Sequence, residues 1–334
     1  MANEMPKDLG IPRWTANAMF NQTSVTEFLL DFSDSQELQP LIFAIFLAAY
    51  LAALIGNLLV IMLVALDHHL HTPMYFFLMN LSILDLGTIS VTVPKSMANS
   101  LWNTRSIPYA GCVAQVFFFF FFATANFASL TIMAYDRCIA ICKPLHYETI
   151  MNRRACVQMA VSAWVSAILY SSLHTGNTFR LPFCHSNIIN KFFCDIPQLL
   201  QLSCSDSYLS EVWLLVFGTC LYFSCFLFII VSYVQIFSVV LRIPSKQGRQ
   251  KAFSTCIPHL LVVSLLIFTA AIAYTKPTSN SPSALDLMVT VMYAVLPSMA
   301  NPIIYSIRNK EIKAALGKFI GRKLFTWKKV SIFF

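Results

Sequence analysis

The chain has 334 residues, of which 57% are hydrophobic and only 11% are charged, whereas an ordinary soluble domain carries about 25% charged residues. So few charges cannot cover a water-facing surface, which excludes an ordinary soluble domain. The net charge of +8 reflects membrane topology and does not indicate a nucleic-acid partner. No Cys or His spacing indicates a zinc module and no Gly-rich unit indicates a nucleotide site, so we expect no metal centre and no organic cofactor.

Seven apolar segments are long enough to cross a bilayer. A spanning helix needs about 20 mostly apolar residues, and a helix satisfies its own backbone hydrogen bonds in lipid. The sequence therefore predicts an all-α membrane protein, a seven-transmembrane helix bundle with a short cytoplasmic amphipathic helix after span seven. The expected spans are residues 40–66, 74–101, 110–141, 155–177, 208–241, 250–275 and 285–307.

The chain divides into three regions. Residues 1–39 form a polar segment, which is too long for span one to be a cleaved signal peptide and which we expect to be extracellular. This segment contains Asn21 in an Asn-Gln-Thr glycosylation acceptor, a modification made outside the cytoplasm. Residues 40–307 form the transmembrane domain, and residues 308–334 form the cytoplasmic tail.

Basic residues predict the orientation. Lys and Arg accumulate in cytoplasmic loops. With the C-terminus inside, 16 of the 23 Lys and Arg residues lie in the loops after spans three and five and in the tail. We therefore expect the N-terminus outside and the protein in the plasma membrane, in contact with the lipid bilayer.

Polar residues in the spans predict a buried network. Asp85 lies in the middle of span two, where a carboxylate is costly and marks a functional site. We expect the amides of Asn57 in span one and Asn301 in span seven to hydrogen-bond Asp85, and we assign Asn126 of span three to the same polar core. Pro302 frees a backbone carbonyl for this network. The network is either a structural knot or a rearrangeable switch that holds water or a sodium ion.

Asp136 and Arg137 end span three on the cytoplasmic side. The carboxylate can hold the adjacent guanidinium in one state and release it in another. The alternative is an arginine that extends to the membrane interface without an ionic partner.

Four of the ten cysteines lie on the outer side, where the compartment is oxidising. Four cysteines allow three patterns of pairing, and spacing alone does not choose among them. These four are Cys112, Cys184, Cys194 and Cys204.

Five stretches of the chain occur in a characteristic order and spacing. They are VTEFLL from Val25, HTPMYFFLMNLSILD over 71–85, MAYDRCIAICKPLHY over 133–147, KAFSTCIPHL over 251–260 and NPIIYSIRN over 301–309. Together they closely resemble the vertebrate olfactory receptors of the rhodopsin-like G-protein-coupled superfamily. The resemblance implies a receptor for small volatile molecules that signals through a heterotrimeric G protein of the stimulatory, cAMP-raising olfactory type.

The resemblance also implies roles for particular residues. It implies disulfides between Cys112 and Cys194 and between Cys184 and Cys204, and a ligand cavity between spans three, five, six and seven in the outer half. The residues assigned to G-protein coupling and activation are Asp136, Arg137, Tyr233, Asn301, Pro302 and Tyr305.

Helical counting selects the candidate ligand residues within that cavity. We expect an apolar cavity with Thr124 and Tyr274 as its hydrogen-bonding groups. The alternative for any single Phe of the run 117–122 is contact with lipid or with a neighbouring helix. The candidates are Phe119, Phe120, Ala123, Thr124 and Phe127 in span three, Phe217 and Leu221 in span five, and Ile267, Ala270 and Tyr274 in span six.

Two departures from the family pattern lie in span six. Leu266-Ile267 stands where many relatives carry Phe-Tyr, so an activation role for a tyrosine there does not carry over. Pro258 replaces a small polar residue, and we expect it to loosen the helix locally.

Three other classes of function fit the sequence less well. A transporter often has repeated halves and Gly-rich interrupted helices, and nine glycines without a repeat argue against it. A membrane enzyme needs a His, Glu or Asp cluster that the helix interiors lack, so we expect no enzyme. A seven-helix receptor for a non-odorant small ligand is the nearer alternative.

Overall fold

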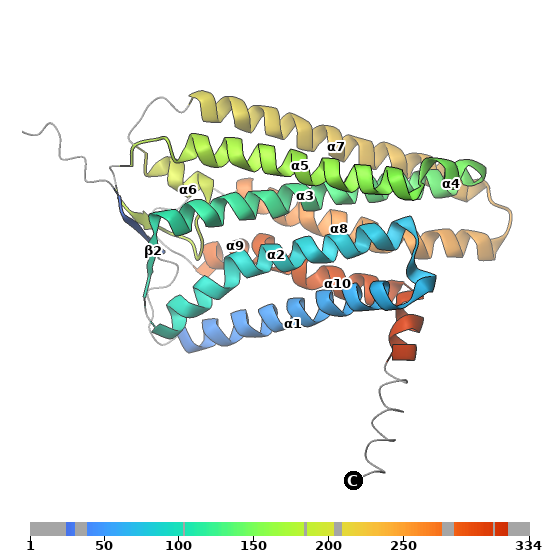
Figure 1. The fold of residues 1–334 in the computed structure, drawn as a ribbon, viewed down its shortest axis with the longest axis horizontal. Helices are drawn as coiled ribbons and strands as arrows, with labels where there is room; N and C mark the ends of the chain where they lie inside the picture. The colour runs from blue at the N-terminus through green and yellow to red at the C-terminus, as the bar shows by residue number, and fades with distance from the viewer. Residues whose placement is uncertain are drawn as a thin grey trace, which may run out of the picture.

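The protein is a bundle of long helices with a small sheet at one end (Figure 1). The computed structural model describes residues 25–30, 39–102, 104–183, 186–203, 209–275, 284–309 and 311–319. Asn21, Cys184 and Cys204 therefore lie outside the described residues, as does the tail from residue 320.

Six helices of the described chain are long and apolar enough to cross a membrane, and a bent pair forms a seventh crossing. The seven expected spans are thereby confirmed. The six are α1 (Gln39–Leu66), α2 (Pro73–Trp102), α3 (Tyr109–Cys142), α5 (Arg153–Thr178), α7 (Leu209–Arg242) and α8 (Lys246–Thr275), and the pair is α9 (Ala284–Ala294) and α10 (Leu296–Arg308).

The seventh span is bent by 46° at the break between α9 and α10. Pro297 is the second residue of α10 and has no N–H to donate to the carbonyl four residues earlier, which explains the break. In contrast, α8 continues through Pro258, so the loosening expected there does not interrupt the helix.

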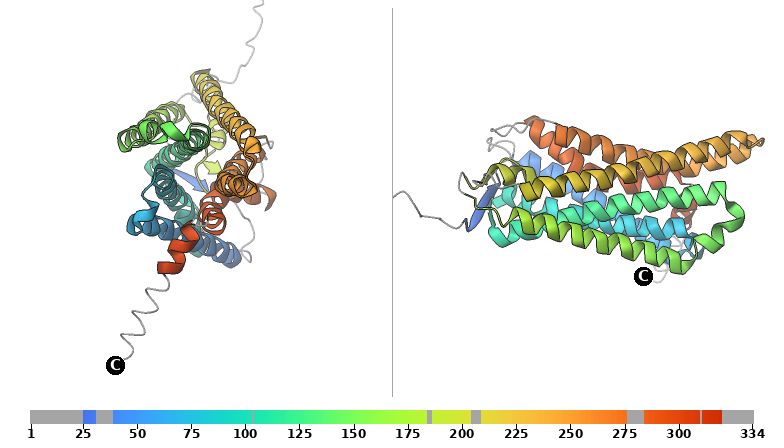
Figure 2. Two further views of the ribbon diagram at one scale, coloured as in Figure 1. Left: turned by 90° about the vertical axis from the view of Figure 1, so that its right-hand side faces the viewer. Right: turned by 90° about the horizontal axis from the view of Figure 1, so that it is seen from above.

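The helix α3 lies at the centre of the bundle and contacts α2, α5, α7 and α8 (Figure 2). The half of α3 farther from the sheet carries the largest apolar core, to which Leu130 and Met133 belong. A central helix that touches four others is suited to link the two ends of the molecule.

Residues 27–30 form part of a three-stranded sheet at one end of the bundle. The strand β1 (Glu27–Leu30) pairs antiparallel with β2 (Ser106–Pro108), with Phe28 opposite Ile107. It also pairs parallel with β3 (Ile188–Ile189) of the loop after α5. The side chains of Phe28 and Leu30 are completely buried, so the VTEFLL stretch closes this end of the bundle. The same outer loop contains α6 (Ile196–Gln201).

Short helices lie at the end of the bundle opposite the sheet. They are η2 (His68–Leu70), η3 (Pro144–His146) and α4 (Tyr147–Ile150). Residues 311–319 form the expected amphipathic helix, which buries Ile312 and Ala315 and exposes Lys313 and Lys318. Asn309 caps this helix, because its Oδ1 accepts the backbone N–H of Glu311 at 2.9 Å.

Candidate functional site

A carboxylate near the middle of the bundle accepts hydrogen bonds from two helices. Asn301 Nδ2 donates to Asp85 Oδ2 at 2.8 Å, and Asn126 Nδ2 donates to Asp85 Oδ1 at 3.4 Å. The Asp85 side chain is 2% exposed. The carboxylate therefore joins α2, α3 and α10 in the core, as the sequence predicts for Asn301 and Asn126.

The prediction that Asn57 hydrogen-bonds Asp85 is wrong. Its Nδ2 donates instead to the carbonyls of Ala53 and Ser298, each at 2.9 Å. Ser298 precedes Pro302 by four residues, so its carbonyl is the one that this proline leaves without a helical donor. The expected role of Pro302 in freeing a carbonyl is thus confirmed, but the freed carbonyl takes the Asn57 amide.

A cavity of about 50 Å³ lies at this polar core. Leu81 and Leu130 line one end of it, and Phe119 and Tyr293 line the end toward the sheet. Asp85, Asn126 and Asn301 line it between these ends. Ligand sites commonly have volumes of about 300–1,000 Å³. The cavity in this state is therefore closed around a volume far smaller than a volatile ligand needs.

The five α3 candidates divide among three places. Phe119 and Ala123 line the cavity. Phe120 stacks on His174 of α5, with ring centroids 5.6 Å apart. The remaining two contact one tyrosine of α7: Thr124 Oγ1 lies 2.8 Å from Tyr222 Oη, and the Phe127 ring centroid lies 5.2 Å from that of Tyr222.

The expected inner face of α7 needs correction. Phe217 and Leu221 are 57% and 47% exposed on the outside of the bundle, so their predicted inward placement is wrong. The α7 residue that contacts Thr124 and Phe127 is Tyr222, which no motif singled out. On α8 the cavity is lined by Val262 and Leu266, and Ile267 packs with Leu266 against the largest apolar core. Ala270 is half-buried one turn above Leu266, and the Tyr274 side chain lies outside the description.

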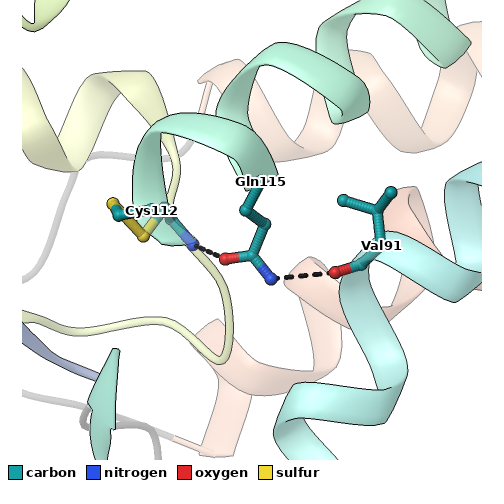
Figure 3. Close-up of a disulfide and its surroundings, with 4 residues drawn as sticks. Val91, Cys112 and Gln115 are labelled. Carbon is teal, nitrogen blue, oxygen red and sulfur yellow. Dashed lines mark hydrogen bonds between the residues drawn. A yellow bond between two sulfur atoms is a disulfide. The ribbon is translucent and has the colours of Figure 1, made fainter. Parts of the chain in front are cut away.

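A disulfide joins the outer loop to α3. Cys112 and Cys194 are bonded, with their Cα atoms 5.6 Å apart, which confirms the expected pair. Gln115 supports it, because its Oε1 accepts the Cys194 N–H at 2.8 Å while its Nε2 donates to the Val91 carbonyl at 2.9 Å (Figure 3). The second expected disulfide falls outside the described residues.

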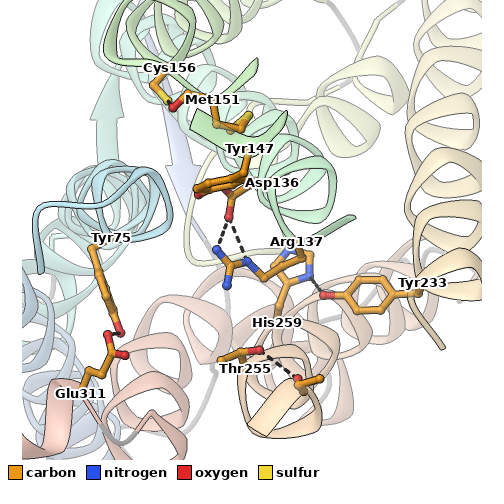
Figure 4. Close-up of polar contacts among 11 residues, drawn as sticks. Tyr75, Asp136, Arg137, Tyr147, Met151, Cys156, Tyr233, Thr255, His259 and Glu311 are labelled. Atoms are coloured by element: carbon orange, nitrogen blue, oxygen red, sulfur yellow. Dashed lines mark hydrogen bonds and ion pairs between the residues drawn. The ribbon is translucent and has the colours of Figure 1, made fainter. Parts of the chain in front are cut away.

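The adjacent acid and base at the end of α3 form an ion pair. Arg137 Nε donates to Asp136 Oδ2 at 2.9 Å, and Tyr147 of α4 donates to Asp136 Oδ1 at 2.7 Å (Figure 4). The Arg137 side chain is only 12% exposed, so the alternative of an interfacial, unpaired arginine does not describe this state. Burial and the nearby Asp136 carboxylate raise the pKa of the Tyr147 phenol above its usual range, so Tyr147 remains a donor.

A buried histidine, to which the sequence analysis gave no role, connects three helices. His259 Nδ1 lies 2.8 Å from Tyr233 Oη of α7 (Figure 4), and His259 Nε2 lies 2.9 Å from the Leu130 carbonyl of α3. His259 is 1% exposed. The signal that could have found it is a histidine in a helix that crosses lipid, within the KAFSTCIPHL stretch.

Comparisons with known proteins identify the family. A family model described as olfactory receptor matches residues 46–323. Human olfactory receptor 14A16 is 53% identical over 92% of this chain and 99% of its own length, and human olfactory receptor 14L1 is 52% identical over 92% and 95%. The fold is similar to that of squid rhodopsin, with a TM-score of 0.64 and 17% identity over 87% of each chain.

These matches cover the bundle, the polar core and the paired Asp136 and Arg137. They confirm that the chain is a multi-pass membrane protein and, because the relatives are receptors, that it is not an enzyme. The chain belongs to the olfactory receptor family.

Proposed function

We propose that this protein is an odorant receptor that binds small, mostly apolar volatile molecules in the outer half of its bundle and activates a stimulatory, olfactory-type G protein to raise cAMP. The observation that carries the proposal is the cavity between Phe119 and Asp85. Its walls are mostly apolar, and Asp85, Asn126 and Asn301 line it between its two ends, so a ligand there contacts the network of α2, α3 and α10.

The proposed ligand contacts are those of the candidate residues that lie toward the cavity. Phe119 and Ala123 line it, and Ala270 lies one turn above the lining residue Leu266. Thr124 shares a hydrogen bond with Tyr222 and is proposed as a polar contact, with Phe120 and Phe127 beside it. A mostly apolar wall with few polar groups suits a weakly polar molecule.

Coupling to the G protein is proposed for the cytoplasmic half. Asp136 holds Arg137 in the present state, so release of the guanidinium is a change that a partner can sense. Tyr233 and Tyr305 are both buried in the same apolar core, and Asn301 and Pro302 connect that core to the cavity. The ligand and the partner therefore act on one connected set of helices.

The orientation and location are also part of the proposal. The disulfide of Cys112 and Cys194 lies at the sheet end, which suits an oxidising exterior, while the basic loops lie at the other end. We propose that the N-terminus is outside, with Asn21 glycosylated and Cys184 paired with Cys204, in the plasma membrane. The bridge between Phe183 and Ser203 brings together the residues that precede those two cysteines.

The test uses cells that carry a cAMP reporter and express the full chain with verified surface display. A panel of volatile molecules is applied to the parent and to Arg137→Ala. The proposal expects at least one volatile to raise cAMP in the parent and not in Arg137→Ala. If the parent responds only to a non-volatile ligand, or signals without raising cAMP, the corresponding part of the proposal is overturned.

A further inference from the structure

Three aromatic rings close the outer end of the cavity. Phe119 comes from α3, Phe193 from the outer loop and Tyr293 from α9. The ring centroids are 4.9 Å apart for Phe119 and Phe193, 6.2 Å for Phe119 and Tyr293, and 6.1 Å for Phe193 and Tyr293. Phe119 and Tyr293 also line the cavity. Each ring thus contacts the other two, and together they separate the cavity from the outer loop.

Polar groups of the outer loop hold the tyrosine in this cluster. Tyr293 Oη donates to Asp195 Oδ2 at 3.1 Å, and the same carboxylate oxygen forms an ion pair with Lys191. The Lys191 ammonium lies 5.5 Å from the centroid of the Tyr293 ring, a distance at which a cation is attracted to an aromatic face. Tyr293 is therefore held both through its hydroxyl and through its ring.

The position of Asp195 is itself fixed. It follows Cys194, which is bonded to Cys112 of α3, and its side chain is 1% exposed. A hydrogen bond to a buried carboxylate is stronger and more directional than one in water. The contact between Asp195 and Tyr293 therefore connects the outer end of α3 to α9 across the end of the cavity.

We propose that Tyr293 is a specificity-determining residue whose ring forms the outer wall of the ligand cavity, held in place by Asp195 and Lys191. The inference rests on the proposed odorant-binding function. In the present state the cavity measures about 50 Å³, so an apolar volatile makes room by displacing this wall. The energy needed to move Tyr293 sets an upper limit on the length of ligand that the cavity accepts.

The first test is a series of straight-chain aldehydes and alcohols in the cAMP assay. Tyr293→Ala removes the wall, so longer homologues are expected to activate at concentrations about tenfold lower than for the parent, the discrimination that one methylene commonly gives. Tyr293→Phe keeps the ring but loses the hydroxyl contact, and a smaller shift in the same direction is expected. An unchanged order of preference along the series in both variants would overturn the proposal.

The second test needs neither a ligand nor a G protein. Ala294 lines the cavity beside Tyr293 and is 1% exposed, so Ala294→Cys places a thiol behind the wall. Its labelling by a membrane-impermeant methanethiosulfonate on intact cells is compared in the otherwise native chain and after Tyr293→Phe or Asp195→Asn. Both changes are expected to accelerate labelling about tenfold. The matched control is Tyr109→Phe, since Tyr109 Oη donates to the Phe179 carbonyl at 3.0 Å and packs in a different apolar cluster.

The two tests separate the possible failures. If no volatile activates any variant but labelling accelerates as expected, the odorant proposal fails and the wall formed by Tyr293 stands. If labelling of Ala294→Cys is the same in Tyr293→Phe, Asp195→Asn and the control, Asp195 does not hold a wall at this position and the inference is wrong.

Discussion

The side chain of Asn57 in α1 donates a 2.9 Å hydrogen bond to the carbonyl of Ser298 in α10. That carbonyl has no donor within its own helix, because residue 302 is proline. The amide of one span thus satisfies the backbone gap that a proline opens in another. Alongside this bond, Gly56 allows the Pro302 ring to approach α1, since a Cβ at Gly56 would lie 2.8 Å from Pro302 Cγ.

Replacing Asn57 is expected to destabilise the bundle. Asn57→Ala leaves the buried Ser298 carbonyl without a donor, and hydrogen bonds between membrane helices contribute about 0.6–1.7 kcal/mol. The melting temperature of the purified receptor, followed by intrinsic fluorescence, should fall. The control is Asn80→Ala, because Asn80 donates only to the Phe76 carbonyl in its own helix.

A second pair of variants tests whether Asn57 stabilises the bundle because Pro302 leaves the Ser298 carbonyl without a donor. Pro302→Ala restores an N–H that can reach the Ser298 carbonyl. Asn57→Ala should therefore lower the melting temperature less in that background than in the native one. Equal decreases in the two backgrounds would mean that the Asn57 amide stabilises the bundle through another contact.

The close approach at Gly56 gives a second prediction. Gly56→Ala should lower surface expression and melting temperature, because its Cβ meets the Pro302 ring at 2.8 Å and the two helices must separate. Gly176→Ala is the control: a Cβ there has no neighbour within 4 Å, and Ala is favoured over Gly in a helix by roughly 0.5–1 kcal/mol. A loss of stability in Gly176→Ala as large as that in Gly56→Ala would contradict the explanation.

The features that could be predicted from the sequence are those that a single segment of the chain determines. Each span is a run of apolar residues, and Asp85 stands out because a carboxylate in lipid is costly. The partner of Asn57 was not predictable, because it depends on how α1 and α10 rotate against each other. The faces of α7 were misassigned because Phe217 and Leu221 belong to a helix that is apolar on all sides, so its periodicity does not mark an inner face.

Pairings between distant segments were also beyond the sequence. The strand of Phe28 pairs with segments about 80 and 160 residues away, and a four-residue strand has no pattern that selects its partners. For the same reason the contact of Asp195 with Tyr293 follows only from the fold. The disulfide of Cys112 and Cys194 was expected from the family resemblance, since four cysteines alone leave three pairings open.

Basal signalling should depend on Tyr147. Tyr147→Phe removes the hydrogen bond to Asp136 Oδ1 and leaves the carboxylate less well oriented toward Arg137. If that bond is worth about 1 kcal/mol, ligand-free nucleotide exchange on the G protein should rise roughly fivefold. Tyr50→Phe serves as the control and should leave exchange unchanged.

The raised pKa of the Tyr147 phenol leads to a prediction about pH dependence. Its pKa lies above the usual range, so raising the pH toward the ordinary tyrosine value of about 10 does not deprotonate Tyr147. The ratio of basal exchange in Tyr147→Phe to that in the parent should therefore stay constant with rising pH. If basal exchange in the parent rose toward that of Tyr147→Phe at moderately alkaline pH, Tyr147 would titrate as an ordinary phenol.

The link between Tyr233 and His259 is expected to be cooperative. Tyr233→Phe leaves His259 Nδ1 without the partner at 2.8 Å, and His259→Ala also removes the contact to the Leu130 carbonyl. Each change should lower thermal stability, with the double variant less destabilised than the sum of the two. A coupling energy of about 0.5–1.5 kcal/mol is expected, and additive effects would show that the two side chains stabilise the bundle independently.

The last prediction concerns the side of α7 that faces the bundle interior. It is measured with any volatile that activates the receptor. Thr124→Val and Tyr222→Phe each remove the one hydrogen bond that joins these side chains, so each should shift the half-maximal concentration in the same direction. The double variant should resemble either single one, because the second change finds no bond left to break. Phe217→Ala and Leu221→Ala should leave the response unchanged, since both side chains face outward. A loss of response in Phe217→Ala at normal surface expression would instead favour the inward face that helical counting predicted.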